Sequence, residues 1–117
     1  MQKALKLFAR LSKGHYPKVK MVYGDVTRDK MFKMADVSSR DFQNPLVLEI
    51  RESVWGLAEI NSVLRDNSDA AYHGLTAGPH DGKKVLLRWL ASDGKYNVIF
   101  ADLSFEQLDK AKLEAIE

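Results

Sequence analysis

The stretch KVLLRWLASDGKYNVIFADL, residues 84–103, carries the clearest fold signal of the chain. Its centre, Asp93-Gly94, is typical of two-residue β-turns, in which both residues need positive φ angles. Counting outward from this turn gives the pairs of one face: Ala91 with Tyr96, Trp89 with Val98, and Leu87 with Phe100. The other face, which pairs Leu90 with Asn97 and Arg88 with Ile99, is only partly apolar. We therefore predict an antiparallel hairpin with one face against helices and the other half-exposed.

The residues after the hairpin predict a C-terminal helix. Ser104 and Gln107 have the spacing of a capping box, and Leu103 and Leu108 can form the hydrophobic staple around it. The apolar stripe expected on this helix consists of Phe105, Leu108, Ala115 and Ile116. Residues 102–117 hold five acidic and two basic residues, so this end of the chain is acidic.

The opposite end is basic, because residues 1–24 contain six lysines and arginines and no acidic residue. At 100° per residue, four of these cations share one helix face: Lys3, Lys6, Arg10 and Lys13. The opposite face is an apolar stripe of Ala4, Leu7, Phe8 and Leu11, at the spacing of a helix packed on a core. Gly14 and Pro17 then predict the end of this helix.

Residues 18–35 predict a strand followed by an ambiguous element. Val19, Met21 and Tyr23 alternate with Lys18, Lys20 and Val22, which favours a strand over 18–23 with one solvated face. Residues 28–35 fit either a helix or a strand, and we expect their Met and Phe side chains to fill the core.

Residues 46–64 predict a strand and then a helix. The apolar run 46–51 opens after Pro45 and favours a strand, and Ser53 can cap a helix after it. The inner face of that helix would consist of Val54, Leu57, Ile60 and Leu64. Gly56 weakens this prediction, because glycine costs about 1 kcal/mol relative to alanine inside a helix.

These elements together predict the fold class. The chain has 117 residues, enough for one domain with its own core, and its composition of 45% hydrophobic and 29% charged residues is that of a globular protein. We predict a small single α+β domain over residues 1–117. Its mainly antiparallel sheet has about four strands, with the N-terminal and C-terminal helices packed on one face.

Several classes of site are excluded by composition. Cysteine is absent, which excludes disulfides, thiolate metal sites and cysteine nucleophiles. No stretch is apolar enough to span a membrane or to serve as a signal peptide, so we expect a soluble, cytoplasmic protein without a membrane partner. No phosphate-binding glycine loop or nucleophile elbow occurs, and we expect no cofactor.

The charge pattern predicts a binding protein. A basic helix face can contact an acidic surface on another protein, as an adaptor, an assembly subunit or an inhibitor does. The expected contact residues are Lys3, Lys6, Arg10, Lys13, Lys18, Lys20, Tyr16 and Tyr23. The same residues suit a nucleic-acid-binding module, with the tyrosines stacking on bases rather than sealing the sheet edge. Alternatively, the acidic C-terminal helix neutralises the basic face within the fold, and the pattern then concerns folding.

An enzyme is the third alternative. The polar segment 66–83 is long for a connection, and it contains His73, His80 and Asp81, which together could form a small acid–base site. Their spacing matches no metal or hydrolase motif, and we expect no metal site. Trp55 and Trp89 are expected in the core. A tryptophan exposed beside the basic helix would instead favour binding by stacking.

Overall fold

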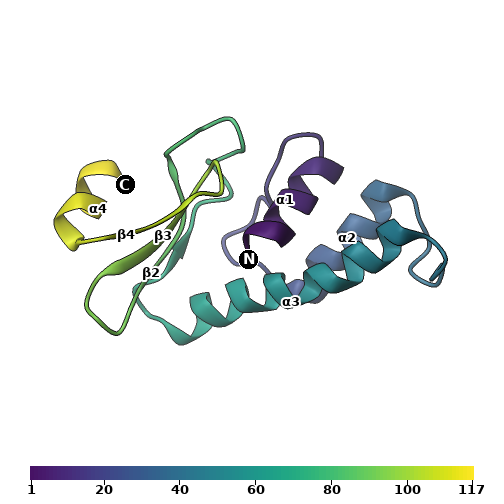
Figure 1. Cartoon of the computed structure of the whole chain (residues 1–117), viewed down its shortest axis with the longest axis horizontal. Helices are drawn as coiled ribbons and strands as arrows, with labels where there is room; N and C mark the ends of the chain where they lie inside the picture. Colours follow the sequence, from purple (N-terminus) through teal and green to yellow (C-terminus); the bar gives the residue numbers. More distant parts are fainter.

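The computed structural model describes residues 1–117 and stacks them in three layers (Figure 1). One outer layer holds three helices: α1 (Gln2–Leu11), α2 (Gly24–Ala35) and α3 (Pro45–Asp66). The central layer is an antiparallel sheet of β1 (Ala71–Tyr72), β2 (Val85–Leu90), β3 (Tyr96–Phe100) and β4 (Phe105–Leu108), in the order β1-β2-β3-β4. The third layer is the short helix α4 (Lys110–Ile116). The predicted α+β class and four-stranded antiparallel sheet are confirmed.

The first helix forms where the sequence predicts it. Ala4, Leu7 and Phe8 are buried on its inner face, together with Leu5. The helix ends at Leu11, two residues before Lys13, which adopts a left-handed backbone with φ 60°. Lys13 therefore leaves the predicted basic face.

The strand predicted at 18–23 is wrong, because this segment connects α1 to α2 without regular structure. Of its apolar side chains Val22 is fully buried, whereas Val19 and Tyr23 are exposed, so the alternating set does not face the core together. The ambiguous segment that follows is helical: α2 buries Thr27 and Met31 one turn apart, with Phe32 beside them. Met31 and Phe32 fill the core, as expected.

The strand predicted at 46–51 is also wrong, because these residues form the first turns of α3. The Asn44 side chain accepts a hydrogen bond from the Leu46 amide at 3.0 Å, and Pro45 occupies the first helical position, where its missing amide hydrogen costs nothing. Ser53 caps nothing. It is buried in mid-helix and its hydroxyl donates to the Ile50 carbonyl.

The hairpin exists, but its predicted register is shifted by one residue. Ala91 pairs with Lys95 through the Ala91 amide, and Gly94 has φ 82°, so the loop has three residues rather than two. The observed partners are Leu90 with Tyr96, Trp89 with Asn97, Arg88 with Val98, and Leu87 with Ile99. A one-residue shift exchanges the faces, so Trp89 no longer shares a face with Tyr96 and Val98 as predicted.

The C-terminal segment corrects two predictions. Residues 105–108 form the edge strand β4 instead of a helix, and α4 starts only after Asp109, whose side chain accepts from the Lys112 amide at 2.8 Å. Within α4 only Leu113 is buried.

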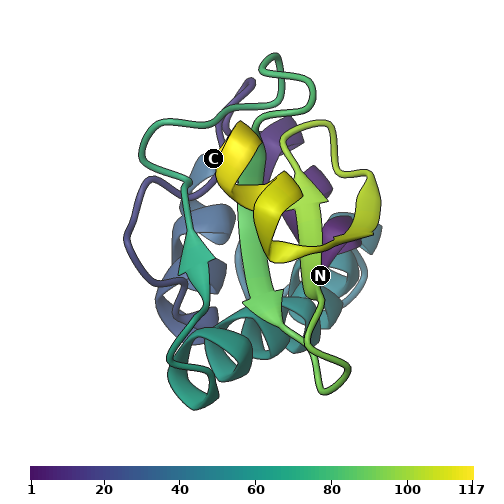
Figure 2. The same ribbon diagram turned by 90° about the vertical axis from the view of Figure 1, so that its left-hand side faces the viewer.

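The two terminal helices pack on opposite faces of the sheet, not on one face as predicted (Figure 2). Leu113 of α4 joins a small cluster with four residues of the sheet, Val85, Tyr96, Val98 and Phe100. The larger core lies on the other side and unites α1, α2 and α3 with Leu86, Leu87 and Ile99. The basic and acidic ends of the chain are therefore separated by the sheet, and α4 does not neutralise the basic face of α1.

Candidate functional site

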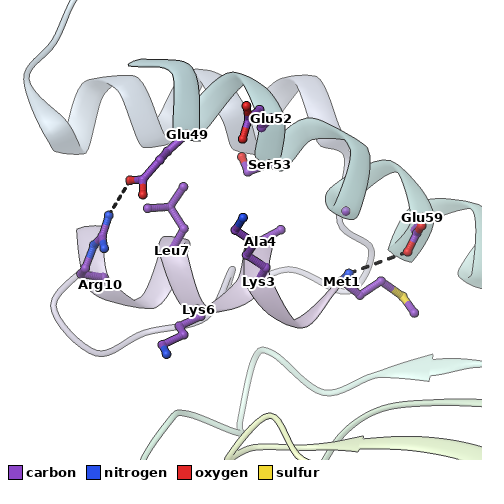
Figure 3. A pocket seen from close by; sticks show the side chains of 11 residues that line it. Met1, Lys3, Ala4, Lys6, Leu7, Arg10, Glu49, Glu52, Ser53 and Glu59 are labelled. Carbon is purple, nitrogen blue, oxygen red and sulfur yellow. Dashed lines mark hydrogen bonds and ion pairs between the residues drawn. The ribbon is translucent and has the colours of Figure 1, made fainter. Parts of the chain in front are cut away.

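A groove of about 650 Å³ lies between α1 and α3 (Figure 3). The two helices run antiparallel, since Met1 lies near Glu59 and Arg10 reaches Glu49. They approach closely at Gly56, where a Cβ atom would lie 2.9 Å from the Cβ of Ala4. The glycine that weakened the helix prediction is thus a contact point between helices, and the small side chains there form the floor of the groove.

The two walls of the groove carry opposite charges. The α1 wall bears Lys3, Lys6 and Arg10, which we call the basic row. The α3 wall bears Glu49, Glu52 and Glu59, which we call the acidic row. In Figure 3, Lys3 and Arg10 extend from α1 toward α3, whereas Lys6 projects from the side of α1 that faces away from α3.

One ion pair joins the two rows, and a second joins the acidic row to the chain terminus. Arg10 Nη2 donates to Glu49 Oε2 at 2.8 Å, and the Met1 amino group lies 3.7 Å from Glu59. Lys3, Lys6 and Glu52 take part in no ion pair. The internal partner of the basic face is therefore α3, not the C-terminal helix, and it leaves the two lysines without a counter-charge.

Trp55 lies on the solvent side of α3, next to the acidic row. It follows Glu52 by three residues and precedes Glu59 by four, which places all three on one helix face. Its side chain is 76% exposed, the largest value among the big apolar residues. The expectation that Trp55 anchors the core is wrong, whereas Trp89 is half-buried and packs against the main core.

The remaining residues of the predicted contact surface lie outside the groove. Lys18 and Lys20 are exposed on the connection between α1 and α2, and Tyr23 is exposed at the start of α2. Tyr16 is buried, and its hydroxyl donates to the Ala101 carbonyl at 2.5 Å. Burial, with a contribution from Asp102, raises the pKa of Tyr16. This ring seals the core and offers no face to a nucleobase.

The residues of the predicted acid–base site are not brought together. His73 Nε2 lies 2.8 Å from Glu117 Oε2, while Asp81 accepts a hydrogen bond from the Gly78 amide at 2.7 Å. His80 is exposed on the turn beside Gly14. No hydrogen bond joins these three side chains, and no group of acidic and histidine residues could hold a metal ion.

A different polar network lies between the sheet and α4, and it is centred on Arg88. The guanidinium contacts Asp69 Oδ1 at 2.9 Å and Glu117 Oε2 at 3.0 Å. Tyr96 donates its hydroxyl to the other oxygen of Asp69, and His73 completes the network at Glu117. The sequence offered one signal for it: Arg88 is a single charge within the apolar run of β2, and such a charge needs a partner.

The network shifts the titration of its members. Hydrogen bonds from Tyr96 and Arg88 lower the pKa of Asp69. Burial alone would raise the pKa of Glu117, but Arg88 and His73 outweigh it and the pKa is lowered. The hydrogen bond to Asp69 raises the pKa of Tyr96. These carboxylates are held ionised as partners of Arg88, which fastens the end of α4 to the sheet.

No helix is both long and apolar enough to cross a membrane. Comparison of the chain with known protein families, with curated proteins and with solved structures finds no match, so the groove between α1 and α3 and the surface around it carry what can be inferred about function.

Proposed function

We propose that this chain is a small, non-catalytic binding protein whose basic row contacts an acidic surface on a protein. One observation carries the proposal: Lys3 and Lys6 project from α1 at the rim of a groove, exposed and without a counter-charge. Arg10, in contrast, has a carboxylate within reach in Glu49. Exposed unpaired cations on a rigid helix instead create a positive potential available to a partner.

The groove adds a second element to this surface. Ala4, Leu7 and Gly56 offer a shallow apolar floor between the charged walls. A protein partner can fill such a floor with side chains while its carboxylates reach the lysines. Protein interfaces combine a partly apolar centre with polar contacts at the rim in the same way.

A nucleic acid suits this surface less well. A phosphate that binds Lys3, which extends toward α3 (Figure 3), also approaches the acidic row, where Glu52 has no cation to neutralise it. Tyr16 is buried and unavailable for stacking, which leaves Tyr23 as the only exposed ring of the two. An enzymatic role for His73, His80 and Asp81 has no support in their positions, since each has a separate partner or faces solvent.

Affinity capture from an extract of the native source tests the proposal. We expect the wild-type chain to retain a protein that is lost at high salt, because exposed charges are screened. The variant Lys3→Glu/Lys6→Glu should lose it. The control Lys30→Glu/Lys33→Glu makes the same charge change at exposed, unpaired lysines of α2 and should retain it.

Two outcomes would contradict the proposal. Capture that is unchanged by reversal of Lys3 and Lys6 would remove the basic row from the interface. Capture that disappears after nuclease treatment would identify nucleic acid as the partner and favour the alternative class.

A further inference from the structure

We propose that the acidic surface contacted by the basic row is the acidic row of a second copy of this chain, so that the protein forms a symmetric dimer through α1 and α3. The inference rests on the proposed function and names its partner. It follows from a simple property of the groove: one molecule carries both rows, the basic row on α1 and the acidic row on α3.

The antiparallel packing fixes which charges lie level along the groove. Ala4 is against Gly56, and Arg10 is against Glu49. Between these two contacts, Lys6 lies level with the turn that begins at Glu52. Lys3 lies on the other side of Ala4, level with the turn that ends at Glu59.

A twofold axis that runs along the groove, within the contact plane, exchanges the two walls. It places the basic row of each copy over the acidic row of the other and keeps the level along the groove unchanged. Lys6 then meets Glu52 of the second copy, and Lys3 meets Glu59 of the second copy. An axis across the groove would superpose like charges, so the charge pattern favours a single arrangement. A closed, isologous interface of this kind is the commonest form of homo-oligomer.

Trp55 supplies the apolar part of this contact. Together with Leu48, which is 47% exposed, it continues the face of Glu52 and Glu59 at the helical spacing 48, 52, 55 and 59. The Trp55 ring is 76% exposed and therefore leaves most of its surface available to a partner. In the dimer it lies over α1 of the second copy, where the methylene stems and ammonium groups of Lys3 and Lys6 can pack on its face. Tryptophan is enriched among the residues that dominate interfaces.

Sedimentation velocity over a range of concentrations up to about 1 mM tests the inference directly. We expect the wild-type chain to shift from a mass near 13.3 kDa toward twice that value as its concentration rises. Salt at about 1 M, where the Debye length falls to about 3 Å, should weaken association. A wild-type chain that stays monomeric at low salt over the whole range would overturn the inference.

Reversing the charges of each row in turn tests whether the basic row of one copy contacts the acidic row of the other. The variants Lys3→Glu/Lys6→Glu and Glu52→Lys/Glu59→Lys should each lose self-association by at least tenfold, because every contact now joins like charges. Their equimolar mixture should restore the dimer, since each copy then offers the charges that the other lacks. Dimerisation of either variant alone, or a mixture that remains monomeric, would contradict the proposed arrangement.

A variant that changes no charge keeps the inference testable if the charge-reversal variants fail to fold. Trp55→Ala removes an exposed side chain, so the fold should persist while self-association weakens by at least tenfold. Val26→Ala is the matched control, because Val26 is 70% exposed on α2 and lies outside the contact. Equal association of these two variants and the wild type would exclude Trp55 from the interface.

The two proposals fail separately. Glu52→Lys/Glu59→Lys keeps the basic row intact, so it should lose self-association yet still capture any other acidic protein. If the wild type is monomeric but loses a captured protein on reversal of Lys3 and Lys6, the proposed function stands and the dimer does not. If reversal changes neither self-association nor capture, both are wrong.

Discussion

Two Arg–Glu pairs in this molecule have nearly the same length and quite different surroundings. Arg10 and Glu49 meet at 2.8 Å with side chains 62% and 49% exposed. Arg88 and Glu117 meet at 3.0 Å with side chains only 18% and 24% exposed. Exposed pairs contribute little to stability, because water and salt screen them, whereas loss of one partner from a half-buried pair leaves a charge without compensation. Distance alone therefore does not show which pair supports the fold.

The difference assigns separate tasks to the two charged regions. The network around Arg88 is satisfied internally: Glu117 fastens the end of α4 to the sheet, and Asp69, in the connection between α3 and β1, is bonded to both Arg88 and Tyr96. The rows on α1 and α3 are only partly paired, and Lys3, Lys6 and Glu52 face solvent without an ion-pair partner. We expect the first region to respond to mutation by a change in stability and the second by a change in binding.

The sharpest test of this comparison is the same substitution made at both arginines. Arg88→Met should lower the free energy of unfolding by about 2 kcal/mol, because it leaves two carboxylates without their cation. Arg10→Met should change it by less than about 0.5 kcal/mol, because its pair is exposed. Urea unfolding followed by circular dichroism measures both. Equal effects at the two sites would show that burial does not distinguish the pairs.

Lowering the pH should weaken the contribution of the Arg88 network to stability and should leave that of the basic row unchanged. The pKa values of Asp69 and Glu117 are lowered in the folded chain, so their contribution to stability is complete above about pH 5, above the unfolded values near 4. It is lost as the pH falls through the lowered folded values. Thermal unfolding between pH 7 and pH 2 should therefore show a decline that is shallower in Arg88→Met.

The control for this titration is Lys3→Gln/Lys6→Gln, which should keep the slope of the wild type because neither lysine pairs with a carboxylate. Asp102 also has a lowered pKa, from its hydrogen bonds with Ser104, and contributes a decline common to every variant. A slope unaffected by loss of Arg88 would mean that Asp102 and other acids account for the whole effect.

A change at Gly56 tests the packing that holds the two rows apart. Gly56→Ala places a Cβ atom 2.9 Å from the Cβ of Ala4, and neither atom can move without its helix. Alanine gains about 1 kcal/mol in helix propensity, and the clash must exceed this gain for the variant to lose stability. We expect a net loss of about 1 kcal/mol in urea unfolding, since overpacking between rigid atoms costs about 1–3 kcal/mol.

The double variant Ala4→Gly/Gly56→Ala restores the space and separates the two terms. If the clash is the cause, the loss in Gly56→Ala should be reduced when Ala4 is also changed, beyond the cost of a glycine in α1. Additive effects would show that the helices separate without strain at this point.

The sequence was sufficient for the fold class and insufficient for the pairing of its elements. Periodicity identified α1 and the hairpin because both carry regular apolar patterns next to glycine turns. It failed at 46–51, where a short apolar run fits either a strand or a helix, and the Asn44-Pro45 start signal decided for α3. It failed at 104–108 because the capping-box pattern was outweighed by pairing of β4 along β3.

Only one of the two rows that form the candidate site could be predicted from the sequence. The basic row followed from charge spacing on α1, but its counterpart on α3 depended on how two helices pack, which no local pattern encodes. Glu49 and Glu52 lie within or beside the run expected to be a strand, so their shared helix face was not apparent. Trp55 was expected in the core because tryptophan is usually buried, and only its observed exposure links it to the groove.

Neutralising Lys3 and Lys6 should have the smallest effect on stability, and it tests whether the basic row serves binding or the fold. Lys3→Gln/Lys6→Gln should change the free energy of unfolding by less than about 0.5 kcal/mol, because neither ammonium group pairs with a carboxylate. Glutamine also retains part of the methylene stem of each lysine. The two lysines lie one helical turn apart, so their removal also relieves a repulsion of a few tenths of a kcal/mol. The same variant should lose self-association and capture. A loss of more than about 1 kcal/mol would instead place the row among the supports of α1, and the contrast with Arg88 would disappear. A chain that keeps its stability and loses its partner would establish that the evenly spaced charge on this helix serves binding.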